Sequence, residues 1–258
     1  MDWKSTLKTT LGGVALFCLG ALVTAIAIGR LPVSVGVWAN RSQIEQVVQE
    51  YLLTHPDIIV QMSNRLNSQQ AAADDKVRSD ALFQAGGSKA LLDPKVAFVE
   101  GPADASVTVA EFFDYRCPHC KASLPAIKDL MSSGMKIRFA FIENPILTPD
   151  SRVAAIAAVA ARRQPGKYVP FHLALMETAG ELPTERILDI AKNVGIDTAK
   201  LEKDMMDPAV LASVEQSKAL AAQLHFNGTP TFVVNDRIVM GELTSNELQT
   251  LAKAPQGL

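Results

Sequence analysis

Hydrophobic and polar positions divide the chain into three stretches with different periodicity. Residues 11–29 form an apolar run without charge, which lysines precede. Residues 41–70 repeat apolar side chains at helical spacing, from Ile44 to Leu66. From residue 93 onward, short β-branched and aromatic runs alternate with helical patterns. The patterns predict a leader, a helical segment and an α/β domain, in that order.

Residues 1–39 are expected to be a signal peptide or a membrane anchor. The apolar core of a cleaved signal spans about 7–15 residues and a membrane-spanning helix needs about 20, and the run over residues 11–29 lies nearer the second length. Small residues suited to cleavage follow it, so both interpretations stay open. Either one places the chain after about residue 40 in the periplasm or cell envelope, released or anchored to the inner membrane.

Residues 40–90 are expected to form a helical segment that joins copies of the chain. Within it, Thr54, Pro56 and Asp57 indicate a new helix start with the threonine as its cap. The polar, alanine-rich residues 67–80 fit either a helix or a linker. The apolar stripe could fold back on its own domain, but its distance along the chain favours pairing with a second copy. We therefore expect a homodimer or a homotrimer.

Residues 91–258 are expected to form one α/β domain. A strand over residues 107–115, a helix from Pro118 and a strand over residues 136–144 predict a right-handed parallel unit. Residues 149–224 are helical in pattern almost throughout, with glycine and proline between the pieces. This block is predicted to be an insertion between two halves of one small sheet.

The C-terminal part is expected to complete that sheet. Two short apolar runs meet at Asn235 and Asp236, which favour a hairpin turn. A last short helix follows, with Thr244 as its cap and Glu247 three residues on. The predicted fold class is therefore α/β, with an inserted helical domain and an N-terminal helical extension.

Composition narrows the classes of partner. The formal net charge is −2 and no long basic run occurs, so the chain lacks the electrostatic footprint of a nucleic-acid-binding protein. With 48% hydrophobic residues it is globular rather than disordered.

The candidate chemistry lies in two cysteines. Cys18 lies in the apolar leader, so the exported part carries only Cys117 and Cys120, which can pair in an oxidising compartment. A helix that starts at Pro118 places Cys117 at its N-terminus, where free N–H groups and the macrodipole favour a thiolate. Cys120 would lie one turn deeper and covered, with Cys117 exposed. His119 adds a donor and, when protonated, a positive charge.

Other uses of two thiols fit less well. A c-type haem site needs histidine after the second cysteine, and Lys121 stands there. A structural zinc site needs four ligands, and no second cysteine pair exists. A disulfide that spans only two intervening residues removes almost no conformational entropy from the unfolded chain, so it would stabilise the fold very little. Redox exchange without a metal or a dissociable cofactor is the main prediction, and a copper-handling protein that uses both thiolates and Met240 stays open.

These motifs resemble the DsbA family of thiol–disulfide oxidoreductases, which have a thioredoxin fold. Three separated segments carry the likeness, which covers about residues 93–254: EFFDY at 111–115, CPHC at 117–120 and GTPTF at 228–232. The segment after Arg41 resembles the N-terminal oligomerising extension of the Com1-like and ScsC-like branch.

The resemblance implies roles for single residues. Pro230 would be the cis-proline facing the disulfide, and the main chain of Thr229 would offer an edge to a substrate strand. Glu111 would be a buried acid beneath the thiols that handles the proton of Cys120, with an exposed strand carboxylate as the alternative. His172 is expected to be a packing residue, because the sequence shows no partner for it.

The implied function is a periplasmic oxidase of exported, cysteine-containing proteins that could also isomerise disulfides. Pro118 and His119 between the cysteines are typical of the oxidase, whereas Thr229 before the cis-proline is more typical of the isomerases. A membrane redox partner, DsbB-like or DsbD-like, would reset the thiols. An envelope-exposed structural or antigen protein that keeps a thioredoxin-like domain is the alternative from another class.

Overall fold

A computed structural model describes residues 41–254 of the chain. The predicted signal peptide or anchor over residues 1–39 lies outside the described residues. Within the described range, no helix is both long and apolar enough to cross a membrane. The chain divides into two compact units, Met1–Arg65 and Leu66–Leu258, which are considered separately.

The first unit contains helix α2 (Arg41–Thr54) and the first turns of α3 (Asp57–Ala85). No residue of α2 is buried. The hydroxyl of Thr54 donates to the carbonyl oxygens of Glu50 and Tyr51 at 2.8 and 3.1 Å. Thr54 therefore ends α2, and the prediction that it caps the next helix is wrong.

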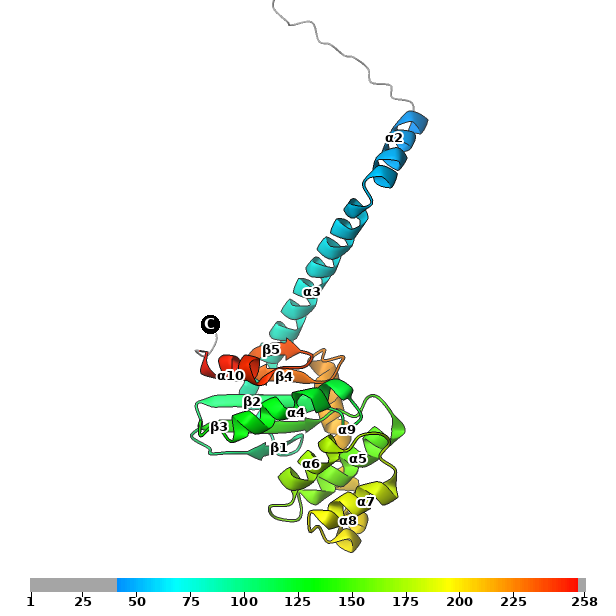
Figure 1. Cartoon of the computed structure of the whole chain (residues 1–258). Helices are drawn as coiled ribbons and strands as arrows, with labels where there is room; N and C mark the ends of the chain where they lie inside the picture. The colour runs from blue at the N-terminus through cyan, green and yellow to red at the C-terminus, as the bar shows by residue number, and fades with distance from the viewer. Residues whose placement is uncertain (1–40, 255–258) are drawn as a thin grey trace, which may run out of the picture. The chain divides into compact units, whose positions relative to one another are not determined.

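The second unit is built on a five-stranded sheet in the order β1-β3-β2-β4-β5 (Figure 1). β2 and β3 are parallel, as predicted, and the other neighbours are antiparallel. β1, which the sequence does not predict as a strand, pairs with β3 along one edge. The strands are β1 (Ala97–Glu100), β2 (Val107–Phe113), β3 (Ile137–Glu143), β4 (Thr231–Val234) and β5 (Arg237–Met240).

Helices separate the two halves of this sheet, as the sequence predicts. Five of them lie between β3 and β4, and Figure 1 shows α5 to α8 gathered on one side of the sheet. The helices of this unit beyond α3 are η1 (Gly87–Leu92), α4 (Pro118–Met131), α5 (Pro149–Ala161), α6 (Tyr168–Glu177), α7 (Thr184–Asn193), α8 (Thr198–Met205), α9 (Pro208–Gln223) and α10 (Ser245–Lys253).

Both faces of the sheet are buried, in two hydrophobic clusters. Alternate β2 residues such as Val109 and Phe113 share one cluster with residues of α4, α5 and α6. Ala110 and Phe112 point to the other cluster, which includes Leu82 from the end of α3. The parallel pair β2–β3 is thus covered on both sides, which fixes the loop that leaves β2.

The predicted C-terminal hairpin and last helix are confirmed. Asn235 and Asp236 have φ values of 49° and 69°, which suit a two-residue hairpin turn. Thr244 and Glu247 form a reciprocal capping box at the start of α10.

Candidate functional site

The loop between β2 and α4 carries the two cysteines, and one carboxylate holds it. Asp114 is buried and accepts hydrogen bonds from the N–H groups of Arg116, Ile146 and Leu147 at 2.7, 2.9 and 3.0 Å. The hydroxyl of Ser151, in the first turn of α5, donates to it at 2.7 Å. Asp114 therefore ties the cysteine loop to the start of the helical insertion.

Cys117 occupies the N-cap position of α4. Its pKa is lowered to about 5, chiefly by a hydrogen bond from the Cys120 thiol, with the Thr229 side chain and the N–H groups of Cys120 and His119 acting in the same direction. The thiol lies 3.0 Å from the carbonyl oxygen of Thr229. Only 3% of Cys117 is exposed, so the prediction of an exposed Cys117 is wrong: the loop before β4 lies against it.

Cys120 lies in the first turn of α4 and is 1% exposed. Burial raises its pKa well above the ordinary value, and its bond to Cys117 and the charge of Glu111 add to this. The two cysteines are not bridged in this structure. One thiol is therefore set to ionise while its neighbour keeps its proton.

Glu111 is a buried carboxyl on β2, as the resemblance implies. It is 2% exposed, and neither of its oxygens has a hydrogen-bond partner among the described residues. Burial raises its pKa to about 8, and the charges of Cys117 and Glu143 add to the shift. The charge of Glu111 in turn adds to the raised pKa of Cys120.

A second buried carboxyl, Glu143 at the end of β3, is absent from the sequence-based site. It accepts hydrogen bonds from the hydroxyls of Tyr115 and Tyr168 at 3.3 and 3.2 Å. Nδ1 of His172 lies 3.1 Å from the hydroxyl of Tyr115. His172 is buried among aromatic rings, as expected of a packing residue, but it also has this polar partner.

His119 and Lys121, on either side of Cys120 in the sequence, have different partners. Nδ1 of His119 lies 3.0 Å from a carboxylate oxygen of Glu242, a residue that the sequence analysis missed. Both side chains are mostly exposed. The ammonium group of Lys121 instead donates to carbonyl oxygens at the end of α6, those of Leu175, Met176 and Thr178. Burial lowers the pKa of Lys121 to about 8.

The loop before β4 completes the site. The peptide bond between Thr229 and Pro230 is cis, as predicted. The N–H group of Gly241, after β5, donates to the carbonyl oxygen of Pro230 at 2.9 Å. The structure thus brings residues from β2, α4 and the β4 loop to one place: Glu111, Cys117, Pro118, His119, Cys120, Thr229 and Pro230.

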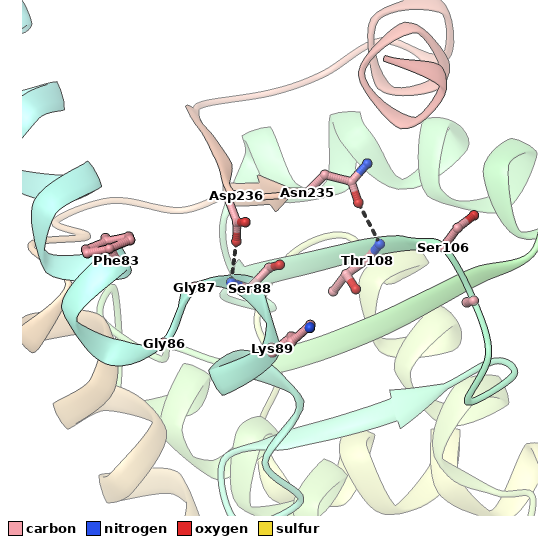
Figure 2. A pocket seen from close by; sticks show the side chains of 10 residues that line it. Phe83, Gly86, Gly87, Ser88, Lys89, Ser106, Thr108, Asn235 and Asp236 are labelled. Carbon is pink, nitrogen blue, oxygen red and sulfur yellow. Dashed lines mark hydrogen bonds between the residues drawn. The ribbon is translucent and has the colours of Figure 1, made fainter. Parts of the chain in front are cut away.

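A cavity of about 410 Å³ lies near the start of β2, whereas the thiols follow its end (Figure 2). The Asn235 side chain accepts from the N–H group of Thr108 at 3.0 Å, and Asp236 accepts from the N–H group of Ser88. These bonds fasten the hairpin to β2 and η1. Residues 41–254 contain no group of three or more histidine, cysteine, aspartate or glutamate residues placed to hold a metal ion.

A reactive thiol pair at a helix N-terminus, beside a mixed sheet with a helical insertion, defines a thioredoxin-fold protein. Residues 95–254 match the family described as Thioredoxin, and residues 40–73 match the Copper resistance protein ScsC N-terminal domain. The chain belongs to this thioredoxin family and is a DsbA/ScsC-like thioredoxin-fold protein. The predicted fold class is confirmed.

Solved and curated relatives extend the comparison. A thioredoxin-like oxidoreductase from Silicibacter pomeroyi DSS-3 is 45% identical with a TM-score of 0.59, over 62% of this chain and 92% of that chain. The thiol-disulfide exchange protein alpha-DsbA2 from Wolbachia pipientis is 33% identical with a TM-score of 0.62, over 69% and 95%. Disulfide bond formation protein D of Bacillus subtilis (strain 168) is 33% identical over 62% of this chain and 77% of its own length.

Some relatives are much longer than the matched region. The chain spans 22% of the length of the Na(+)/H(+) antiporter NhaA 1 of Salinispora arenicola (strain CNS-205), and the two are 32% identical over 148 residues, 57% of this chain.

Proposed function

We propose that the chain is a periplasmic thiol–disulfide oxidoreductase that introduces disulfide bonds into exported proteins. The observation that carries the proposal is the opposite pKa shift of two neighbouring thiols, to about 5 at Cys117 and well above the ordinary value at Cys120. A thiol of low pKa is a good leaving group and is mostly thiolate at neutral pH, so Cys117 exchanges with substrate. Cys120 is released as a protonated thiol when a substrate thiolate opens the disulfide.

The oxidising cycle balances without a dissociable cofactor. A substrate thiolate attacks the Cys117 sulfur, the Cys117–Cys120 bond breaks, and Cys120 takes a proton, a role that we assign to the buried carboxyl of Glu111, whose raised pKa of about 8 keeps it protonated at neutral pH. A second substrate thiolate attacks the substrate sulfur of the mixed disulfide, and Cys117 leaves as thiolate. The substrate loses two electrons to the dithiol, which a DsbB-like or DsbD-like membrane partner reoxidises.

The loop before β4 is proposed to hold the substrate. The main chain of Thr229 lies directly against the Cys117 thiol, so an extended substrate segment that pairs with this loop would place its cysteine beside Cys117. Pro118 starts α4 directly after Cys117 and needs no N–H partner there.

The test is oxidation of a reduced, unfolded substrate by the full chain. Cys117→Ser is expected to lose the activity, because it removes the exchanging sulfur. Cys18→Ser, the same substitution at the third cysteine, serves as the control and is expected to oxidise substrate like wild type. Equal rates for wild type and Cys117→Ser would refute the proposal.

Isomerisation and self-association form a second proposal, which the exposed apolar side chains of α2 favour. Ile44, Val47, Val48 and Tyr51 recur at helical spacing and are each about half exposed or more, which is unusual for a helix that stays alone in water. A homodimer or homotrimer through this stripe would hold a misfolded substrate between several dithiols.

Light scattering and reactivation of scrambled ribonuclease test this second proposal together. Val47→Asp is expected to reduce both the mass and the isomerase activity, while Gln46→Asp, an exposed polar position on the same helix, leaves both unchanged. A monomeric mass for the wild type would end the proposal.

A further inference from the structure

The segment that follows β5 is anchored on both sides of one acidic residue. The N–H group of Gly241 donates to the carbonyl oxygen of Pro230 at 2.9 Å. The N–H group of Leu243 donates to the hydroxyl of Ser123 on α4 at 3.0 Å, in a buried position. Gly241 has a φ of 99°, which a residue with a side chain rarely adopts. Glu242, between these anchors, therefore has a fixed main-chain position beside the first turn of α4.

The side chain of Glu242 uses that position to meet His119. The two side chains are 57% and 64% exposed, and a pair with such exposure contributes little to the stability of the fold. The hydrogen bond and the charge of Glu242 raise the pKa of His119. We therefore expect the pair of His119 and Glu242 to act on the chemistry of the neighbouring thiols rather than on the stability of the fold.

The other charged groups near His119 have partners of their own. The Cys117 thiolate raises the pKa of His119 further. Lys121 is bound to the carbonyl oxygens at the end of α6, and the guanidinium of Arg116 lies 3.1 Å from Asp150. Among the described residues, Glu242 is thus the acidic side chain that faces the imidazole.

We propose that Glu242 is a positioning residue that keeps His119 protonated in both redox states near neutral pH, so that reduction of the dithiol takes up one proton rather than two. The inference rests on the proposed exchange at Cys117 and Cys120. Two electrons break the S–S bond, Cys117 becomes a thiolate, and the single proton goes to Cys120. Without Glu242, the imidazole is mostly neutral in the oxidised protein and binds a second proton when the thiolate forms.

The difference is visible when glutathione is the reductant. Two glutathione thiols give one glutathione disulfide and two protons. In the wild type one proton goes to Cys120 and the other to solvent, whereas without Glu242 the second proton goes to His119. A cation that is in place before the thiolate forms is a preorganised charge, which costs no rearrangement during the exchange.

The experiment compares Glu242→Gln with wild type in redox equilibrium with glutathione, from about pH 6 to about pH 8 around the ordinary histidine pKa. The slope of the reduction potential against pH counts the protons taken up. Near pH 7 we expect about one in the wild type and a value closer to two in the variant. Glu202→Gln, the same charge change on α8, is the control and should match the wild type.

Two further measurements separate a role in positioning from a general structural effect. The His119 pKa in the oxidised protein, followed by NMR, should fall toward about 6.5 in Glu242→Gln and stay raised in Glu242→Asp. In a His119→Gln background, Glu242→Gln should no longer change the proton count. If wild type and Glu242→Gln both exchange with glutathione, with equal proton counts and the same His119 pKa, the inference about Glu242 is overturned and the proposed function stands. If the wild type does not exchange with glutathione, the proposed function is overturned as well.

Discussion

The two sides of the dithiol show how one residue type acquires two chemistries. On the helix side, Cys117 receives hydrogen bonds from the first turn of α4, and its pKa falls to about 5. On the sheet side, burial raises the pKa of Cys120, and the charge of Glu111 on β2 adds to the rise. The two cysteines are three residues apart, so their spacing in the sequence brings the two thiols together. Their surroundings in the fold make one thiol acidic and keep the other protonated.

The largest expected effect comes from removing the sheet-side thiol. Cys120→Ser cannot form the Cys117–Cys120 disulfide, so oxidation of a reduced substrate is lost. Its Cys117 thiolate should still attack a disulfide-bonded substrate and displace one substrate thiolate, and this adduct accumulates on non-reducing gels because the Cys120 thiol is missing. A serine hydroxyl can still donate to Cys117, whereas alanine cannot.

Cys120→Ala should therefore raise the pKa of Cys117 by roughly one unit relative to Cys120→Ser, which is about 1.4 kcal/mol. The rate of alkylation against pH measures it. Identical profiles for the two variants would show that the Cys120 hydrogen bond does not lower the pKa of Cys117.

Glu111→Gln is expected to have the next largest effect, by removing the acid on the sheet side. Attack of a substrate thiolate on the Cys117–Cys120 disulfide should slow by roughly 10²-fold, because Cys120 then leaves without its proton donor; this is the lower range for a lost general acid or base. Stopped-flow fluorescence with a substrate peptide measures this step separately. An unchanged rate would leave Glu111 with no part in the proton transfer.

The same variant should change how stability depends on pH. In the folded protein Glu111 keeps its proton up to about pH 8, while in the unfolded chain it loses it near 4.5. Stability therefore falls as pH rises between these values, by up to about 1.4 kcal/mol per pH unit. Urea unfolding of wild type and Glu111→Gln should diverge over this window, with the variant more stable at neutral pH.

Cys117 should contribute the opposite slope. Its folded pKa of about 5 lies below its ordinary value of 9.0, so ionisation stabilises the reduced fold as pH rises from about 5 to 9. The contribution is complete above pH 9 and is lost as pH falls through about 5. Unfolding of the reduced wild type and of Cys117→Ala measures it, and parallel curves would contradict it.

Thr229→Val should have the smallest effect of the series. The carbonyl that faces Cys117 belongs to the main chain and stays in place, while the Thr229 side chain, which helps to lower the pKa of Cys117, loses its hydroxyl. We expect a change in stability below about 1 kcal/mol and a small rise in the Cys117 pKa, followed by the rate of alkylation against pH. An unchanged Cys117 pKa would show that the hydroxyl does not act on the thiolate.

Most of the features predicted correctly from the sequence depend on residues that are close together along the chain. The capping box at Thr244 and the hairpin at Asn235 depend on adjacent residues, and both occur in the structure. The cysteine spacing and the helix start at Pro118 likewise placed the thiols. Thr54 is an exception. Its hydroxyl could cap the following helix or bond to the preceding one, and in the structure it donates to a carbonyl oxygen of α2.

Long-range pairing accounts for what the sequence did not predict. Glu242 meets His119 across 123 residues, and the carboxyl of Glu143 meets Tyr115 across 28. Nothing in the periodicity around either residue marks such a partner. The burial of Cys117 is of the same kind, because the covering loop comes from a distant part of the chain.

The contrast between the two buried carboxyls offers a label-free reporter. Glu111 lacks hydrogen-bond partners among the described residues, while two tyrosine hydroxyls donate to Glu143. A protonated carboxyl vibrates at a higher C=O stretching frequency when nothing donates to it, so the two groups should give separate infrared bands. Burial raises the pKa of Glu111 to about 8 and the charge of the Cys117 thiolate adds to this, so near pH 8 the higher band should be stronger in the reduced protein than in the oxidised one.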